Sequence, residues 1–157
     1  LISLPKLPVG LQGLYCQNCI SITSLPKLPI GIQELWCQGC TSLTSLPDLP
    51  VGLYWLNCID CTSLTMLPEL PAGLQELWCQ GCTTLTILPT LPTGLQRLWC
   101  RGCTWLPNRN LLYAENIQKL QLLQRNLKTL LFRRKSAVRN LLKKSFYKDL
   151  VRLIQTF

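Results

Sequence analysis

Hydrophobic positions recur at fixed places in a 21-residue unit over about the first two thirds of the chain. The copies are residues 3–23, 24–44, 45–65, 66–86 and 87–107, and they align without insertions. A period of this size predicts a solenoid in which each copy forms one coil and stacks on the next. We therefore expect residues 1–107 to form one structural domain.

Each copy predicts one short strand and one extended return segment. Leu11, Leu14 and their counterparts 21 residues later should point into the solenoid and stack about 4.8 Å apart in a parallel sheet. Pro26 and Pro29 remove two N–H donors and fix φ, so segment 25–29 is expected to be extended and not helical. The glycine that follows, such as Gly31, should permit the turn back into the sheet.

The unit resembles the leucine-rich repeat family. Its skeleton is L-x-x-L-x-[LC]-x-x-[NC]-x-x-L, present in the second copy as Ile32, Leu35, Cys37, Cys40 and Leu43. The LPxLP segments resemble the short repeats of bacterial type III secreted effectors. The LxCxxC form is most similar to leucine-rich repeat proteins of large nucleocytoplasmic DNA viruses.

This resemblance implies an α/β repeat fold. The expected architecture is a leucine-rich repeat solenoid with a short parallel β-sheet and an extended convex side, followed by a C-terminal α-helical segment. By analogy it implies a non-catalytic protein–protein interaction module that uses the concave face. The alternative it offers is a structural role, as a minor capsid or virion-associated component of a large DNA virus.

Residues 108–157 differ from the repeats in composition. They contain 12 basic and 2 acidic side chains, whereas residues 1–107 contain 4 basic and 5 acidic ones. Pro, Gly and Cys are absent after Pro107, and apolar residues recur at helical spacing, first over 113–131 and then over 138–157. We predict two basic amphipathic helices that cap the last coil or anchor the chain.

The composition of the chain limits the activities, cofactors and cellular locations that we expect for it. The chain has no His, which removes the commonest general base and a frequent metal ligand, so we expect no enzymatic activity and no cofactor. No apolar run reaches the length of about 18 residues needed to span a bilayer. Ten cysteines without a small secreted scaffold fit a reducing compartment, so we expect the chain in the host cytoplasm or in a virion.

The cysteines offer a third hypothesis for function, a Cys-rich metal-binding scaffold. The ten Cys occupy two positions of the repeat, in C-x2-C pairs separated by 17 residues, a spacing that matches four-Cys zinc sites. If a pair such as Cys37 and Cys40 leaves its strand in extended form, the two residues are too far apart for a disulfide. A disulfide between equivalent cysteines of neighbouring coils would require the stacked coils to be distorted. We therefore favour buried thiols that act as small apolar core residues, the second of each pair donating weakly to the turn backbone.

An aromatic stripe is the candidate binding surface. Residues between the inward Leu and the first Cys of each copy should face outward on the concave side. Large aromatic side chains there match the enrichment of Trp and Tyr in binding hot spots, although packing of the rings on one another is the alternative explanation. The predicted partner-binding residues are Tyr15, Trp36, Trp55, Asn57, Trp78, Trp99, Arg97 and Arg101.

The tail carries the remaining candidate site. Its basic cluster can neutralise phosphates or an anionic membrane surface, although a solvated cationic face is the commoner role of such a helix. We therefore expect protein partners, capsid or host proteins among them, ahead of nucleic acid or a membrane surface. The cluster consists of Arg133, Arg134, Lys135, Arg139, Lys143 and Lys144.

Overall fold

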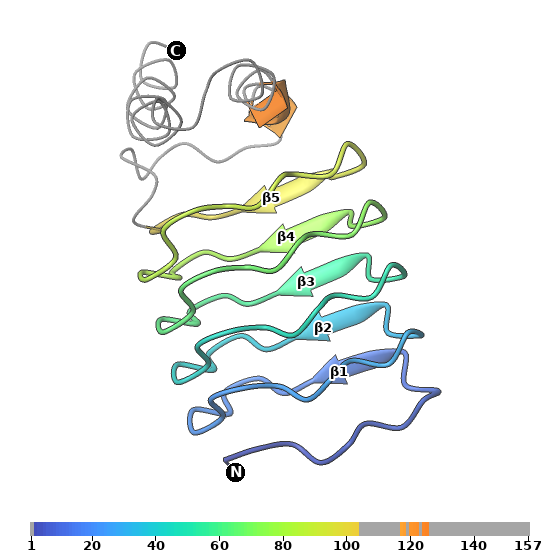
Figure 1. Ribbon diagram of the computed structural model, residues 1–157. Coiled ribbons are helices and arrows are strands. Elements are labelled where there is room, and N and C mark those ends of the chain that lie inside the picture. The colour runs from blue at the N-terminus through green and yellow to red at the C-terminus, as the bar shows by residue number, and fades with distance from the viewer. Residues whose placement is uncertain (1, 104–116, 119, 123, 126–157) are drawn as a thin grey trace, which may run out of the picture.

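The repeats form a parallel β-solenoid, shown as a computed structural model in Figure 1. The structure describes residues 2–103, 117–118, 120–122 and 124–125. Five short strands make one sheet in the order β1-β2-β3-β4-β5, and all neighbours are parallel. Their bounds are Gly13–Tyr15 (β1), Glu34–Trp36 (β2), Trp55–Asn57 (β3), Glu76–Trp78 (β4) and Arg97–Trp99 (β5). The predicted leucine-rich-repeat-like solenoid is confirmed.

Each coil is in phase with the next. Leu14 pairs with Leu35, Leu35 with Leu56, and so on through Leu98, a shift of 21 residues at every step. The same shift holds outside the strands, where Ser24 pairs with Ser45. Because equivalent residues lie above one another, each position of the repeat becomes a column of similar side chains that runs along the solenoid.

The core consists of stacked leucine and cysteine columns. The central strand leucines, together with most of the Leu and Ile of the return segments, are almost completely excluded from water. Full burial of a Leu side chain contributes about 1.5–3 kcal/mol, so these columns supply the main stabilisation of the repeats. The central column is Leu14, Leu35, Leu56, Leu77 and Leu98.

The segment between the paired cysteines is a tight turn, so the extended form considered in excluding a disulfide within a pair is not the one adopted. Cys40 N donates to Cys37 O over 3.3 Å, and the equivalent bond recurs in the three later repeats. The residue before the second cysteine has a positive φ, between 55° and 81°. That position holds only residues that tolerate the left-handed region, namely Asn18, Gly39, Asp60, Gly81 and Gly102.

The other turn, which leads back to the strand, does not need a glycine in the way that was expected. In every repeat the turn has the sequence Pro-Xaa-Gly, and the residue after the glycine donates its N–H to the carbonyl oxygen of the proline. In the second repeat this bond runs from Ile32 N to Pro29 O over 3.2 Å. The glycines at 10, 31, 52, 73 and 94 have φ outside the left-handed region. A Cβ at Gly52 would make only ordinary contacts of 3.7 Å with two carbonyl oxygens. The left-handed glycine requirement therefore belongs to the cysteine turn.

The return segments are extended, as the prolines predicted. Residues 2–103 contain no helix. Beyond them, the described residues 117–118, 120–122 and 124–125 have helical backbone, and Ile117 and Leu120 join the core cluster. Gln121 Nε2 donates to Pro92 O over 2.6 Å. The rest of the two helices predicted for 108–157 lies outside the described residues.

Alanine substitutions at two glycines test which turn requires one. In Gly81→Ala the new Cβ would collide with Asp60 Oδ1 at a φ of +72°, so we expect the free energy of unfolding to fall by about 1–3 kcal/mol. Gly52→Ala should be neutral or stabilise by up to about 1 kcal/mol, because it restricts only the unfolded chain. Urea denaturation measures both. Equal losses would contradict this assignment of the two turns.

Candidate functional site

The outer face of the sheet, called the strand face below, is built from two columns of strand residues. The first strand position holds Gly13, Glu34, Trp55, Glu76 and Arg97, and the third holds Tyr15, Trp36, Asn57, Trp78 and Trp99. The leucine between them points into the core, since side chains alternate along a strand. A third row, just beyond the strands, consists of Gln17, Gln38, Ile59, Gln80 and Arg101.

Five aromatic rings form a continuous ladder across all five strands. Ring centroids lie 6.1 Å apart for Tyr15 and Trp36, 5.0 Å for Trp36 and Trp55, and 5.6 Å for Trp55 and Trp78. The last pair, Trp78 and Trp99, is stacked at 4.2 Å with an interplanar angle of 22°. The in-phase coils hold these rings at distances where aromatic pairs attract one another. The rings therefore form one rigid strip.

Asn57 does not belong to the exposed surface, so the expectation that it faces outward with the rest of its column is wrong. It is the one member of its column that is not aromatic, and it is completely buried. The rings of Trp36 and Trp78 come from strands two apart, yet their centroids are only 6.1 Å from each other, so they lean together over β3. Trp55 fills the remaining gap. Beneath them, Asn57 Nδ2 donates to Gln38 Oε1 over 2.9 Å.

The ends of the ladder are open to solvent, whereas its middle is not. Tyr15 is 58% exposed and Trp99 is 42% exposed. Trp36, Trp55 and Trp78 are half-buried by one another. Mutual packing of the rings, the alternative considered for the stripe, therefore accounts for the middle of the ladder, and exposed aromatic surface remains at both ends.

Glu34 links the ladder to a tyrosine outside the strands. Tyr15 Oη donates to Glu34 Oε2 over 2.8 Å, and Tyr54 Oη donates to Glu34 Oε1 over 2.7 Å. The hydrogen bond from Tyr54, followed by that from Tyr15, lowers the pKa of Glu34, and the same bonds raise the pKa of both phenols. Tyr54 was not among the predicted site residues. It occupies the place of a Gln in the other copies, and this departure from the repeat was the available signal.

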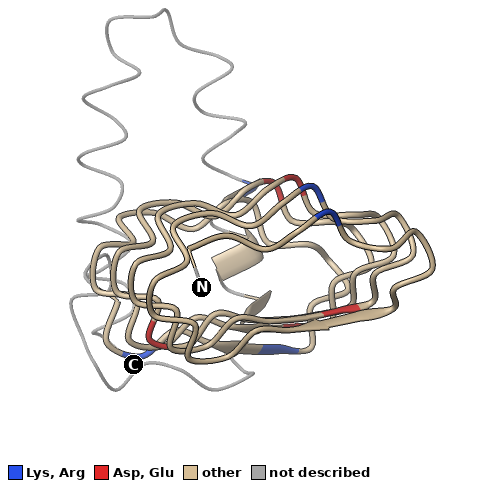
Figure 2. Ribbon diagram, turned by 90° about the horizontal axis from the view of Figure 1, so that it is seen from below, with Lys and Arg blue, Asp and Glu red and all other residues tan. Residues whose placement is uncertain are grey.

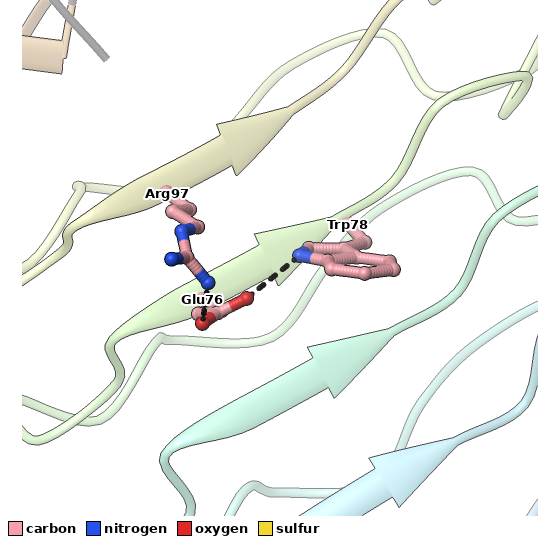
Figure 3. A network of polar contacts seen from close by, with 3 residues as sticks. All are labelled: Glu76, Trp78 and Arg97. Atoms are coloured by element: carbon pink, nitrogen blue, oxygen red, sulfur yellow. Dashed lines mark hydrogen bonds and ion pairs between the residues drawn. The ribbon is translucent and has the colours of Figure 1, made fainter.

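A second carboxylate orders the other end of the strand face (Figure 3). Glu76 Oε2 accepts from Trp78 Nε1 over 3.1 Å, and Glu76 Oε1 accepts from Arg97 Nη1 over 2.7 Å. Arg97 and Arg101 are both exposed, as predicted. The strand face thus has a carboxylate held by two tyrosines near β1 and exposed guanidinium groups near β5.

The cysteines form two buried columns joined by thiol hydrogen bonds. All ten are thiols, and only Cys19 is not classed as buried. In repeats two to five the second cysteine donates to the carbonyl of the first cysteine in the preceding repeat, from Cys40 Sγ to Cys16 O over 3.0 Å and from Cys61 Sγ to Cys37 O over 3.1 Å. The same bond recurs from Cys82 and Cys103. The predicted donation to backbone is therefore present, and its acceptor lies in the neighbouring coil.

The described cysteines do not support the metal-binding hypothesis. No group of three or more Cys, Asp or Glu in the described part of the chain is placed to hold a metal ion. From the second repeat on, the second thiol of each pair instead donates to a backbone carbonyl. The C-x2-C spacing here serves the turn and the core.

The basic tail cluster, Arg133, Arg134, Lys135, Arg139, Lys143 and Lys144, lies outside the described residues, so its predicted role stays a prediction. Within the part of the chain that is described, no helix is long and apolar enough to cross a membrane.

Raising the pH should destabilise the solenoid through its thiols. Burial raises the pKa of Cys16 from 9.0 to about 12, and the adjoining Cys61 thiol together with burial raises that of Cys37. Above the unfolded pKa the unfolded chain loses these protons first, so the free energy of unfolding should fall as pH rises from about 9 to 12. Chemical denaturation at several pH values in this range measures the free energy of unfolding. In Cys16→Ala the slope of that free energy against pH should be smaller, by the amount that corresponds to about one proton released on unfolding. A flat or rising profile would contradict the burial of the thiols.

Removing the central indole should weaken the ladder more than removing its end. Trp55 packs against the rings of both Trp36 and Trp78, so we expect Trp55→Ala to cost about 2 kcal/mol of unfolding free energy. Trp99→Ala should cost about half as much, because Trp99 stacks on Trp78 alone among the described rings and is partly exposed. Trp55→Phe is the matched control: it keeps a ring and removes an Nε1 that is buried without a hydrogen-bond partner among the described residues. A larger loss of unfolding free energy in Trp99→Ala than in Trp55→Ala would contradict the greater contribution assigned to the central ring.

No protein-family model matches the chain, and no curated protein matches it. Among solved structures, the chain is similar to YopM from Yersinia enterocolitica WA-314, at 28% identity and a TM-score of 0.43. The match covers 64% of this chain and 26% of that one, so this chain spans about a quarter of YopM's length. The leucine-rich-repeat-like fold therefore rests on this chain's own period, register and parallel sheet.

Proposed function

We propose that the chain is a non-catalytic protein-interaction module that binds its partner on the strand face. The observation that supports this most is the aromatic ladder, whose rings are fixed by one another and whose ends, Tyr15 and Trp99, remain exposed. Rigid aromatic side chains lose little conformational entropy when a partner covers them. Leucine-rich-repeat-like folds commonly serve as scaffolds for protein interaction.

The charges of the strand face favour an oriented partner. Near β5, Arg97 is 61% exposed and Arg101 is exposed, whereas Glu34 near β1 is engaged by two tyrosines. An acidic group on the partner would therefore lie over the β5 end, with apolar or aromatic groups along the ladder. Electrostatic complementarity of this kind sets orientation and association rate more than affinity.

The cellular place and the role of the tail belong to the same proposal. We place the chain in a reducing compartment, the host cytoplasm or a virion assembled there, because a core of ten thiols suits such a setting.

We also propose that the tail caps the last coil. Ile117 and Leu120 join the core, and Gln124 Nε2 donates to Pro89 O over 3.0 Å.

Site-specific photo-crosslinking tests the binding surface. A benzophenone amino acid placed at Tyr15 or at Trp99 of the full chain should yield a discrete adduct with a protein other than a second copy. The matched control is the same probe at Thr41, which is exposed in the cysteine turn away from the strand face. Arg101→Glu should weaken the adduct formed from Trp99, because it removes the charge next to that ring. Adducts that arise equally from Thr41, or that contain nucleic acid, would refute the proposal.

A further inference from the structure

A second exposed surface runs along the solenoid, from the side opposite the strands to the turns that lead back into them (Figure 2). In every repeat the return segment ends in a Pro-Xaa-Gly turn closed by a hydrogen bond of 3.0–3.2 Å, and the residue Xaa sits at the outer corner. We call the strip that contains these corners and the charged residue three positions before each of them the shoulder. Because the turns are closed identically, the shoulder presents its side chains in straight columns.

The first column of the shoulder is apolar and exposed. Val9 is 86% exposed, and Ile30 and Val51 are each 79% exposed. Ala72 continues the column and is also exposed, and the fifth repeat ends it with Thr93. Single exposed apolar side chains are common on protein surfaces. A continuous row of large ones indicates a surface that another molecule covers.

The second column is charged, and its signs are ordered. It reads Lys6, Lys27, Asp48 and Glu69 along the first four repeats, and Thr90 ends it in the fifth. All four charged side chains are exposed, and none makes an ion pair with another residue of the described part. Figure 2 shows basic and acidic segments side by side on the side opposite the strands.

The order of these charges is self-complementary. A two-fold axis that passes between the second and third repeats, perpendicular to the column, reverses the sequence plus, plus, minus, minus. It places Lys6 against Glu69 of the other copy and Lys27 against Asp48. The same axis pairs Ile30 with Val51, and Val9 with Ala72. One symmetry operation therefore satisfies both columns, as an isologous interface requires.

From this we propose that the shoulder is the site of homodimer formation, with two copies of the chain packed antiparallel through repeats one to four. The occupant is a second copy because the complement of each charged residue lies in the same column of the same chain. This proposal is independent of the strand-face function, since the strand face remains open in such a dimer. Both patterns stop at the fifth repeat, where Gln121 and Gln124 contact the return segment through Pro89 and Pro92.

The dimer should be weak and sensitive to salt. Four coils span about 14 Å from first to last, so the buried area lies well below that of a standard interface. Its ion pairs are exposed and are screened at high ionic strength. Sedimentation equilibrium of the full chain should show a monomer–dimer equilibrium at low salt, with dissociation as salt is added.

Charge exchange within the column tests the proposal. Lys27→Asp turns two symmetry-related attractions into repulsions and should raise the dissociation constant about tenfold, and Asp48→Lys should do the same. The double variant, Lys27→Asp with Asp48→Lys, restores opposite charges across the two-fold axis and should recover the dimer. Each substitution introduces a residue that the neighbouring repeat already carries at that place, so the fold should tolerate it.

Thr83→Glu is the matched control, because this exposed residue follows Cys82 at the opposite end of the coil. It should leave the dissociation constant unchanged. Three results would overturn the proposal: a monomer at every concentration, a dimer indifferent to Lys27→Asp, or a double variant no better than the single ones. Equal weakening by Thr83→Glu would show a general charge effect and would also overturn it.

Discussion

The in-phase stacking of 21-residue coils is the constraint on which every other feature depends. Strands three residues long have little stability alone, and they persist because each is hydrogen-bonded to the coil above and below and packs on a common core. The constant shift converts a position in the repeat into a column in space. Leucines then bury leucines, rings pack on rings, and corner residues line up along the shoulder.

The cysteine columns show why a small donor is useful inside such a stack. In repeats two to four the carbonyl of the first cysteine, such as Cys37, accepts both from Cys40 N in its own turn and from Cys61 Sγ in the next coil. Both lone pairs of a buried carbonyl are thereby satisfied, which avoids the cost of an unpaired polar group. The thiol is also small and apolar enough to belong to the core. It therefore joins neighbouring coils without a disulfide or a metal.

The period predicted the sheet, the inward leucines and the extended return, because each is a property of every copy. What it could not predict are effects of one copy on its neighbours. Asn57 looked exposed by strand alternation, but the indoles of Trp36 and Trp78 lean over it from the adjacent strands. Tyr54 reaches Glu34 of the preceding repeat, a contact with no counterpart elsewhere in the column. The left-handed residue of the cysteine turn was detectable, since only Gly, Asn and Asp occupy that position in the five copies, but the C-x2-C spacing by itself does not distinguish a turn from an extended segment.

The two sides of the solenoid carry different chemistry on one scaffold, aromatic rings on the strand face and apolar corners with paired charges on the shoulder. Both depend on the coils being stacked so that the cysteines face the interior. Alkylation of the native full chain, with each cysteine followed by mass spectrometry, tests this most directly. We expect Cys19 to be modified first, and Cys37, Cys58 and Cys79 to react only when the chain is unfolded. Modification of those three at the rate of Cys19 in the folded protein would contradict this stacking.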